Sequence, residues 1–442
     1  MPHVVVLAAG SSSRFEPLKE KNLYKFLGKT VLQHIIEQFL ANGFEKFTVI
    51  AGSHNIGLVE KDLKENVSAK HIRILEQKGD GQAGAVSTGI ESLVDEQDVL
   101  IINGNDVYET NLIESFANKV SQYKAGGHNI LTGYKVDSYF PGGYLLVEGE
   151  EVKGVIEKPG EGNEPSDLVR IVFDYFSSVK DLKQSLAKAS SNKDDLYETA
   201  LNDMINTDKK FKLLRYSGEW NSIKYPWHVL SLMQYFLGTL EAQIVADDAF
   251  ISDKATVRGK VVIESGAKVF DGACINGPAY IGKNVIVGNG ALVRDSIVGD
   301  KSVVGYNSEV ARSYLREEVW LHTNYVGDSI IDKNVSFGSG AVTANLRLDE
   351  ENISIEVKGE KIDTGVQKIG AIIGPYVRIG VGAKLMPGVK IGGNSAIGPG
   401  VVLSQDLGVN SFIQVKQQLE IKENKLDISG IDREQLKNKL EK

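Results

Sequence analysis

An aliphatic residue recurs at every sixth position over a long stretch near the end of this 442-residue chain. One register holds Ile373, Ile379, Leu385, Ile391, Ile397 and Leu403, and a second holds Val377, Ala383, Val389, Ser395 and Val401. Hexads that pair a large with a small inward residue are typical of a parallel β-helix, in which glycines turn the corners between flat faces. The period predicts stacked coils, which are left-handed in hexapeptide proteins.

An earlier block repeats this spacing before the period is interrupted. Its aliphatic positions are Ile281, Val287 and Val293 and, after the loss of one residue, Val298 and Val304. Between the two blocks, residues 346–366 break the period and are rich in charge. We expect this segment to project from the coil as a loop, and loops of this length in a regular solenoid are more often functional than accidental.

The first half of the chain follows a different pattern. Short apolar runs at residues 4–10, 46–52 and 98–104 each end in glycine, and the apolar spacing predicts helices at 31–42 and 83–93. Alternating strands and helices indicate a mainly parallel α/β sheet, whose ligands bind beyond the carboxyl ends of the strands.

These patterns divide the chain into four predicted parts. They are an α/β domain over residues 1–226, a linker helix over 227–246, a β-helix over 247–411 and a helical tail over 412–442. The linker helix is predicted to follow Pro226 and to end near Ala246.

Composition limits the partners that such a chain can have. The net charge of -8 gives no general attraction to nucleic acid or to an anionic membrane, so we expect a small phosphorylated ligand. Cys274 is the single cysteine, and no run approaches the roughly 20 apolar residues of a membrane span. The N-terminus has no signal peptide pattern, and we expect a cytoplasmic protein.

Several motifs carry a resemblance to a known family. They are LAAGSSSRF at residues 7–15, Lys21, QKGDGQAGA at 77–85, Asp106, Gly143 with EKP at 157–159, and the segment from His322 to Leu346. The chain resembles the sugar-1-phosphate nucleotidylyltransferases, and specifically the bifunctional members with an acetyltransferase domain. This resemblance implies a Rossmann-like nucleotidyltransferase domain followed by a left-handed parallel β-helix of hexapeptide repeats.

The resemblance implies roles for residues of the first domain. Leu7, Ala8, Ala9, Gly10, Gln77 and Gly81 would bind the nucleotide, and Arg14 and Lys21 would act on its phosphates. Asp106 would bind Mg²⁺, which bridges phosphates through one or two carboxylates. The slot for a second metal ligand falls on Asn221 or Ser222, and we predict Asn221.

The sugar would be bound by Gly143, Glu157 and Lys158. The sequence departs from the family pattern at a few positions. Ser12 stands for glycine, Glu20 for proline and Asp80 for threonine, and Val169 and Arg170 occupy the slot where an asparagine often reads the sugar substituent.

In the second domain, the resemblance makes His322 the general base that takes a proton from a sugar amine during attack on acetyl-CoA. A neutral imidazole suits this work near pH 7. Tyr325 and Asn345 would position the sugar. Relatives carry a lysine soon after the asparagine, and Lys358 or Lys361 would have to replace it here.

The predicted function is transfer of a nucleotidyl group from UTP or dTTP to a hexose-1-phosphate, with N-acetylation of an amino sugar-1-phosphate at a second site. The resemblance also implies a homotrimer. Two alternatives stay open, a single-activity nucleotidylyltransferase with a structural β-helix and a non-enzymatic scaffold like the translation-factor exchange subunits. Lys21-Asn22 and Tyr24-Lys25 are also similar to choline-phosphate cytidylyltransferases, which lack a long β-helix.

Overall fold

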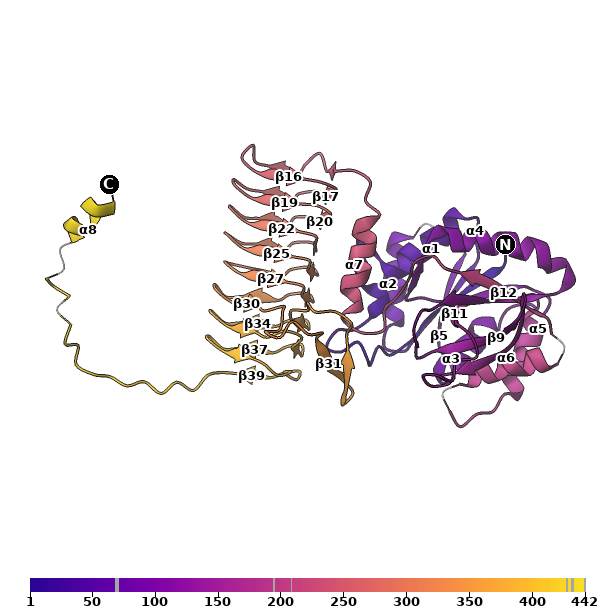
Figure 1. Cartoon of the computed structure of the whole chain (residues 1–442). Coiled ribbons are helices and arrows are strands. Elements are labelled where there is room, and N and C mark those ends of the chain that lie inside the picture. The colour runs from indigo at the N-terminus through magenta and orange to yellow at the C-terminus, as the bar shows by residue number, and fades with distance from the viewer. Residues whose placement is uncertain (68–70, 194, 208, 427, 431–432, 441–442) are drawn as a thin grey trace.

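The computed structural model describes residues 1–67, 71–193, 195–207, 209–426, 428–430 and 433–440. An α/β part and a β-helix lie side by side, with helix α7 (His228–Gly238) between them (Figure 1). Among the described residues, no helix is long and apolar enough to cross a membrane.

The α/β part is built on a nine-stranded sheet. In spatial order its strands are β5 (Ile72–Glu76), β4 (Phe47–Ala51), β1 (His3–Ala8), β6 (Val99–Asn103), β11 (Leu168–Phe176), β8 (Asn129–Lys135), β12 (Phe211–Tyr216), β10 (Glu151–Glu157) and β9 (Gly143–Glu148). The first four strands are parallel, as predicted, whereas β11 is antiparallel to β6 and β8, and β9 and β10 form a hairpin. The prediction of a mainly parallel sheet is therefore wrong for the second half, where β8 and β12 are parallel but the other neighbouring strands are antiparallel. Antiparallel neighbours such as β9 and β10 need only a tight turn between them and no crossover helix.

Helices and short strands complete this part. The helices are α1 (Val31–Ala41), α2 (Ile56–Asn66), α3 (Gly81–Ile90), α4 (Thr110–Tyr123), α5 (Val179–Lys188) and α6 (Leu196–Asn206), with the 3-10 turns η1 (Lys21–Leu23) and η2 (Lys124–Gly126). The short strands are β2 (Lys25–Phe26), β3 (Lys29–Thr30), β7 (Asp106–Tyr108) and β13 (Trp220–Ser222). Helices α1 and α3 lie where the apolar spacing predicts them, and Thr30 and Gln33 start α1 with a capping box.

The β-helix has three faces of short parallel strands. The first face contains β14 (Ile244–Val245), β17 (Val261–Ile263), β20 (Ala279–Ile281), β23 (Ile297–Val298), β26 (Tyr314–Leu315), β28 (Ile330–Ile331), β33 (Ile372–Ile373) and β36 (Lys390–Ile391). The second contains β15 (Phe250–Ile251), β18 (Lys268–Val269), β21 (Ile286–Val287), β24 (Val303–Val304), β29 (Ser336–Phe337), β34 (Arg378–Ile379), β37 (Ala396–Ile397) and β39 (Phe412–Ile413). The third contains β16 (Thr256–Arg258), β19 (Cys274–Asn276), β22 (Leu292–Arg294), β25 (Glu309–Ala311), β27 (Tyr325–Gly327), β30 (Val342–Thr343), β35 (Lys384–Leu385) and β38 (Val402–Leu403).

The hexad positions form the core of this β-helix, as predicted. Both registers are buried from Ile373 to Leu403, including the small member Ser395. The segment that breaks the period forms a hairpin of β31 (Ser354–Val357) and β32 (Glu360–Asp363), which leaves the coil as expected. Its buried residues Ile353 and Ile355 join the hydrophobic cluster at the junction of the two parts.

Aromatic side chains hold the two parts together on the first face of the β-helix. Tyr24 stacks on Tyr314 at 5.6 Å, and Phe26 packs between Phe236 of α7 and Tyr314, at 5.1 and 5.3 Å. The Tyr314 hydroxyl donates a 2.8 Å hydrogen bond to the carbonyl of Lys25. The segment that follows Lys21 in sequence is thus packed against the β-helix.

The linker helix is shorter than predicted. Helix α7 ends at Gly238, because residues 244–245 pair with β17 and begin the β-helix rather than continue the helix toward Ala246. At the other end, the last coil extends to β39 (Phe412–Ile413), beyond the predicted limit at residue 411. The prediction of a helical tail is wrong for residues 414–426, which form neither helix nor strand, and helix α8 (Arg433–Leu440) follows later.

Candidate functional site

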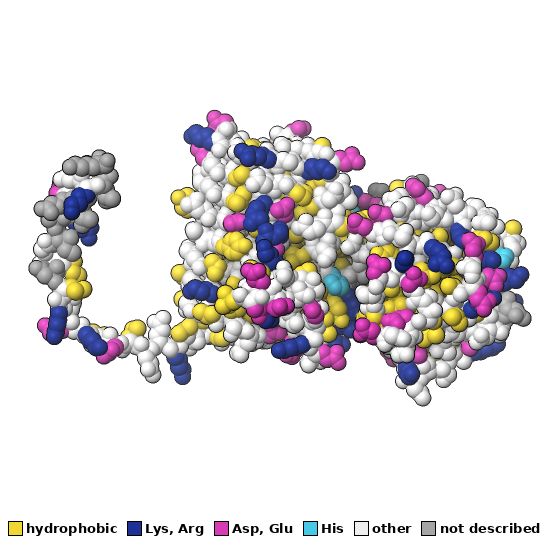
Figure 2. Space-filling view, in the orientation of Figure 1, with side chains coloured by type: hydrophobic (Ala, Val, Ile, Leu, Met, Phe, Trp, Pro, Cys, Tyr) yellow, Lys and Arg dark blue, Asp and Glu magenta, His cyan; other side chains and the backbone are white. Residues whose placement is uncertain are grey.

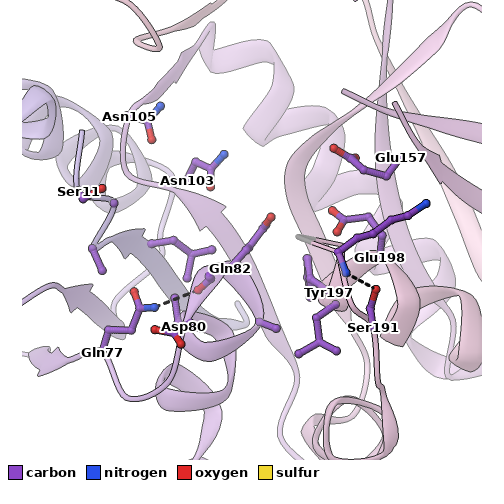
Figure 3. Close-up of a pocket in the computed structure, with 18 of the residues that line it drawn as sticks. Ser11, Gln77, Asp80, Gln82, Asn103, Asn105, Glu157, Ser191, Tyr197 and Glu198 are labelled. Atoms are coloured by element: carbon purple, nitrogen blue, oxygen red, sulfur yellow. Dashed lines mark hydrogen bonds between the residues drawn. The ribbon is translucent and has the colours of Figure 1, made fainter. Parts of the chain in front are cut away.

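A cavity of about 740 Å³ opens beyond the carboxyl ends of β1 and β6. Figure 3 shows Gln77 and Asp80 on one wall and Glu157, Tyr197 and Glu198 on the wall that faces it. The predicted residues that line it are Leu7, Ala9, Gly10, Lys21, Gln77, Gly81, Glu157 and Lys158. Residues from four separate stretches of the sequence therefore meet in one space, at the sheet edge where α/β proteins bind ligands.

The loop after β1 is held in place at its start. Ala8, a predicted nucleotide-binding residue, is not among the lining residues; it is buried, and its carbonyl accepts hydrogen bonds from Asn22 and Asn55 at 3.0 and 3.1 Å. These bonds fix the loop at the point where it leaves the strand. Arg14 also lies outside the lining residues and is exposed, although its charge still lowers the pKa of Lys21.

The segment after β5 is held in shape by its own glutamine. The side-chain amide of Gln77 donates to the carbonyls of Gly79 and Gly81 at 2.9 and 3.0 Å, which closes the turn before α3. Gln82, in the same segment, was not predicted as a site residue. Its buried Nε2 has no hydrogen-bond partner among the described residues, although the residue lines the cavity. A buried amide without a partner suits a ligand that supplies an acceptor.

Lys21, which lines the cavity, is electrostatically coupled to Asp106, which is buried and is not among the lining residues. Burial lowers the pKa of Lys21, the carboxylate of Asp106 opposes that change, and Arg14 and Lys224 lower the pKa further. Burial raises the pKa of Asp106 against hydrogen bonds from Ser222 and Asn103 and the charge of Lys21. The carboxylate accepts bonds from Asn103 at 3.1 Å and from Asn105 at 3.2 Å.

The pairing of β13 with β7 decides which residue lies beside Asp106. Ser222 pairs with Asp106 and Asn221 with Val107. Because successive side chains of a strand point to opposite faces, Ser222 shares the side of Asp106 and Asn221 does not. Asn221 lines, with Glu109 and Tyr235, a separate cavity of about 860 Å³ whose lining does not include Ser222. The structure thus separates Asn221 from the carboxylate with which it was predicted to act.

The sugar end of the cavity combines predicted and missed residues. Gly143 pairs with Glu157 across the β9–β10 hairpin, and Glu157 forms a 3.0 Å ion pair with Lys158. A Cβ at Gly143 would lie 3.0 Å from the Glu157 carboxylate, so a larger residue would crowd it. The facing wall, which no sequence motif predicted, consists of Ser191, Lys193, Leu196, Tyr197 and Glu198.

A second cluster of polar side chains lies on the β-helix. The amide of Asn345 donates to the Tyr325 hydroxyl at 3.3 Å and to Asp328. Asp328 also accepts two hydrogen bonds of 2.7 Å from Arg312. The structure therefore brings the predicted residues Tyr325 and Asn345 together, and it adds Asp328 and Arg312.

His322 lies outside this cluster. It is exposed in the corner that precedes β27, where its backbone N–H donates to Asn324 at 2.7 Å and its carbonyl accepts from Ser308 at 2.9 Å. The turn is thus fixed, and the imidazole is presented at the surface of the β-helix.

Comparison with known proteins places the chain in a family. Residues 3–223 match the nucleotidyl transferase family model, and residues 370–405 match the bacterial transferase hexapeptide model of six repeats. The chain is 33% identical to the bifunctional protein GlmU of Methanococcus maripaludis strain C7 over 430 residues, which cover 94% of this chain and 98% of the relative.

Two further relatives agree. A bifunctional sugar-1-phosphate nucleotidylyltransferase/acetyltransferase of Sulfurisphaera tokodaii is 33% identical over 93% of this chain and 99% of its own length. The bifunctional protein GlmU of Methanocaldococcus jannaschii is 30% identical over 85% of this chain and 88% of its own length. Together with the two-part fold, these matches show that the chain belongs to the family of bifunctional sugar-1-phosphate nucleotidylyltransferase/acetyltransferases.

Proposed function

We propose that the first site transfers a uridylyl or thymidylyl group from UTP or dTTP to N-acetylglucosamine-1-phosphate or glucose-1-phosphate. The second site would N-acetylate an amino sugar-1-phosphate with acetyl-CoA. The observation that supports the first reaction best is the single cavity that Lys21, Gln77 and Glu157 line together. Gln77 on one wall would contact the nucleotide, and Glu157 on the facing wall would contact the sugar (Figure 3).

In the first reaction, a phosphate oxygen of the sugar-1-phosphate attacks the α-phosphorus of the nucleotide. A new P–O bond forms, the bond between the α- and β-phosphates breaks, and pyrophosphate leaves with the electron pair. The ammonium of Lys21 would neutralise charge that develops on the α-phosphate in this partly buried site. The guanidinium of Arg14 would contact the pyrophosphate as it leaves.

The residues around Asp106 fit a magnesium ion. Within the described residues, no group of three or more His, Cys, Asp or Glu side chains could hold a metal without substrate. This sparse set suits Mg²⁺, which binds one or two carboxylates, keeps waters and takes the rest of its ligands from phosphates. Asp106 would hold the ion, with Ser222 beside it. When bound, the ion would supply positive charge that stabilises the phosphates of the transition state.

In the second reaction, the sugar amine attacks the thioester carbonyl of acetyl-CoA and CoA leaves as the thiol. His322 would accept the proton that the amine loses as the C–N bond forms. Tyr325 and Asn345, fixed by Asp328 and Arg312, would hold the acceptor sugar in reach.

A homotrimer would complete the second site. His322 shares a corner of the β-helix with Tyr306 and Val381, whose side chains are 61% and 59% exposed, and Trp320 nearby is 57% exposed. Figure 2 shows hydrophobic side chains exposed over the β-helix among charged ones. Apolar residues around an exposed polar group are suited to contact with a second copy of the chain, which would then cover the imidazole.

Two assays test these proposals. Pyrophosphate release is measured with UTP and dTTP against a panel of sugar-1-phosphates, and CoA release is measured with acetyl-CoA and glucosamine-1-phosphate or galactosamine-1-phosphate. The proposals expect both products from the wild-type chain. Release of pyrophosphate but not of CoA would indicate that the β-helix is a structural domain. Release of neither product would favour a non-enzymatic scaffold.

A further inference from the structure

A buried ion network lies behind the sugar wall of the first site. Nη1 of Arg170 on β11 is 2.6 Å from Oδ2 of Asp174, and Nη2 bonds to Oε1 of Glu198 at the start of α6. The guanidinium stacks 5.2 Å from the ring centre of Tyr197, whose hydroxyl donates to Asp174 at 3.1 Å. The side chains of Arg170, Asp174 and Glu198 are only 4%, 0% and 10% exposed, so this arrangement is rigid rather than a solvated surface pair.

The network carries more negative than positive charge. Burial alone would lower the pKa of Arg170, but Asp174, Glu198 and, more weakly, Glu157 outweigh it and raise that pKa. Glu157 therefore lies within electrostatic range of the same guanidinium. One guanidinium faces three carboxylates here, and two of them, Glu157 and Glu198, line the cavity.

The network is also incomplete without a ligand. Nε of Arg170 and Oδ1 of Asp174 are buried and have no hydrogen-bond partner among the described residues. Nε lies 4.0 Å from the place where a Cβ would stand on Gly143, and Oε2 of Glu157 lies 3.0 Å from it. Glycine at this position leaves the space between Glu157 and the network open.

From this arrangement we infer that Glu198 is a sugar-specificity residue, which Arg170 positions so that its free carboxylate oxygen accepts a hydrogen bond from the hexose ring alongside Glu157. This inference rests on the proposed nucleotidyl transfer. Two carboxylates on one wall select a sugar that presents donors, namely hydroxyl or amine groups. Lys158 pairs with Glu157 at 3.0 Å, so the repulsion of a sugar that carries its own carboxylate comes from Glu198, whose partner Arg170 is shared with Asp174. The preferred substrate class is a neutral or amino hexose-1-phosphate, and hexuronic acid 1-phosphates are excluded.

The test compares Glu198→Gln with the wild-type full-length chain in the pyrophosphate-release assay. We expect the KM for the hexose-1-phosphate to rise about tenfold to a hundredfold, the usual effect of losing a hydrogen bond to a charged group. The KM for the nucleotide should change less than twofold. The ratio of kcat/KM between a hexose-1-phosphate and the hexuronic acid 1-phosphate of the same ring configuration should fall at least tenfold, because one repelling charge is gone.

Glu198→Asp and Glu151→Gln are the controls. The aspartate keeps the charge that pairs with Arg170, so Glu198→Asp should retain the discrimination against the hexuronic acid. If Glu198→Gln does not fold, Glu198→Asp still tests the proposal. Glu151 lies on the same strand as Glu157 but is half-buried and outside the cavity lining, and its variant should behave as wild type. If Glu198→Gln weakens nucleotide and sugar equally, or leaves the hexose-to-hexuronate ratio unchanged, Glu198 is only a counter-ion of Arg170. A wild-type chain that releases no pyrophosphate would instead overturn the proposed function.

Discussion

The hydroxyl of Tyr24 donates a 3.0 Å hydrogen bond to Asp332, a residue of the β-helix 308 positions later in the chain. Arg316 forms a 2.9 Å ion pair with the same carboxylate and lies 4.7 Å from the centre of the Tyr24 ring. Tyr24 directly follows the η1 turn that carries Lys21. The β-helix therefore supports the segment that presents the central cation of the first site.

Removal of this bond should loosen the first site and lower stability. In Tyr24→Phe we expect the free energy of unfolding to fall by about 1.5–3 kcal/mol, the range for a buried hydrogen bond to a charged group. Asp332 keeps its pairing with Arg316, so the fold should survive. Thermal and urea unfolding measure the loss, and the KM for the nucleotide should rise several-fold. Tyr376→Phe, which alters an exposed tyrosine of the β-helix, is the control, and equal stability of the two variants would contradict the prediction.

The β-helix could be predicted in detail because its core repeats locally. Each hexad specifies its own inward residues, so Ile373 and Leu403 were placed correctly without knowledge of any distant contact. The contact of Tyr24 with Asp332 has no such signal. A tyrosine in a charged stretch looks the same whether it is exposed or packed on a coil that forms much later in the chain.

Lys21 should give the first reaction an alkaline limit. Its pKa is lowered by burial and by Arg14 and Lys224, and the amine must be charged to neutralise phosphate. The kcat for pyrophosphate release should therefore fall at a pH below the ordinary lysine value of about 10.4. If Lys21→Arg remains active, its kcat should fall only at a higher pH than that of the wild type, because a guanidinium stays charged.

Lys29→Arg is the matched control for that profile. Lys29 lies in the same basic stretch but is exposed and pairs with Glu37 at 2.5 Å. Its variant should leave the profile unchanged. A wild-type profile that stays flat up to pH 10.5, or a Lys21→Ala variant that loses less than about tenfold in rate, would remove Lys21 from the mechanism.

Asp106 should cost stability in the absence of a cation. A carboxyl whose pKa is raised in the folded state destabilises that state once pH rises above the unfolded pKa, and the full penalty is present above the folded pKa. In EDTA at neutral pH, Asp106→Asn should therefore unfold at a higher temperature than the wild type and release no pyrophosphate. The difference in Tm should shrink toward pH 3, where the wild-type carboxyl is protonated. A variant less stable than the wild type at pH 7 would contradict this account.

The site could be predicted only in part, and the errors have physical causes. Gln77 and Glu157 follow strands in recognisable motifs, whereas Tyr197 and Glu198 begin an amphipathic helix that resembles any surface helix. The choice of Asn221 over Ser222 depended on strand register. A difference of one residue sends a side chain to the opposite face of a strand, and β7 and β13 are too short and too far apart in sequence for the pattern to fix their pairing.

Asp328 should matter for the second reaction although it was not predicted. Its carboxylate holds both Arg312 and Asn345. In Asp328→Asn we expect the KM for the amino sugar-1-phosphate to rise about tenfold or more and stability to fall by about 1.5–3 kcal/mol. Pyrophosphate release should be unchanged. Asp271→Asn, which breaks an exposed 3.1 Å pair with Lys254 several coils away, should affect neither activity. Unchanged CoA release in Asp328→Asn would show that the cluster does not position the acceptor.

We expect one chain to carry two separate active sites, one on the α/β part and one on the β-helix. Pyrophosphate release and CoA release measured side by side in Asp106→Ala and His322→Ala test this expectation. Asp106→Ala should abolish pyrophosphate release and keep CoA release, and His322→Ala should do the reverse. Loss of both activities in either variant, or retention of both in each, would contradict it.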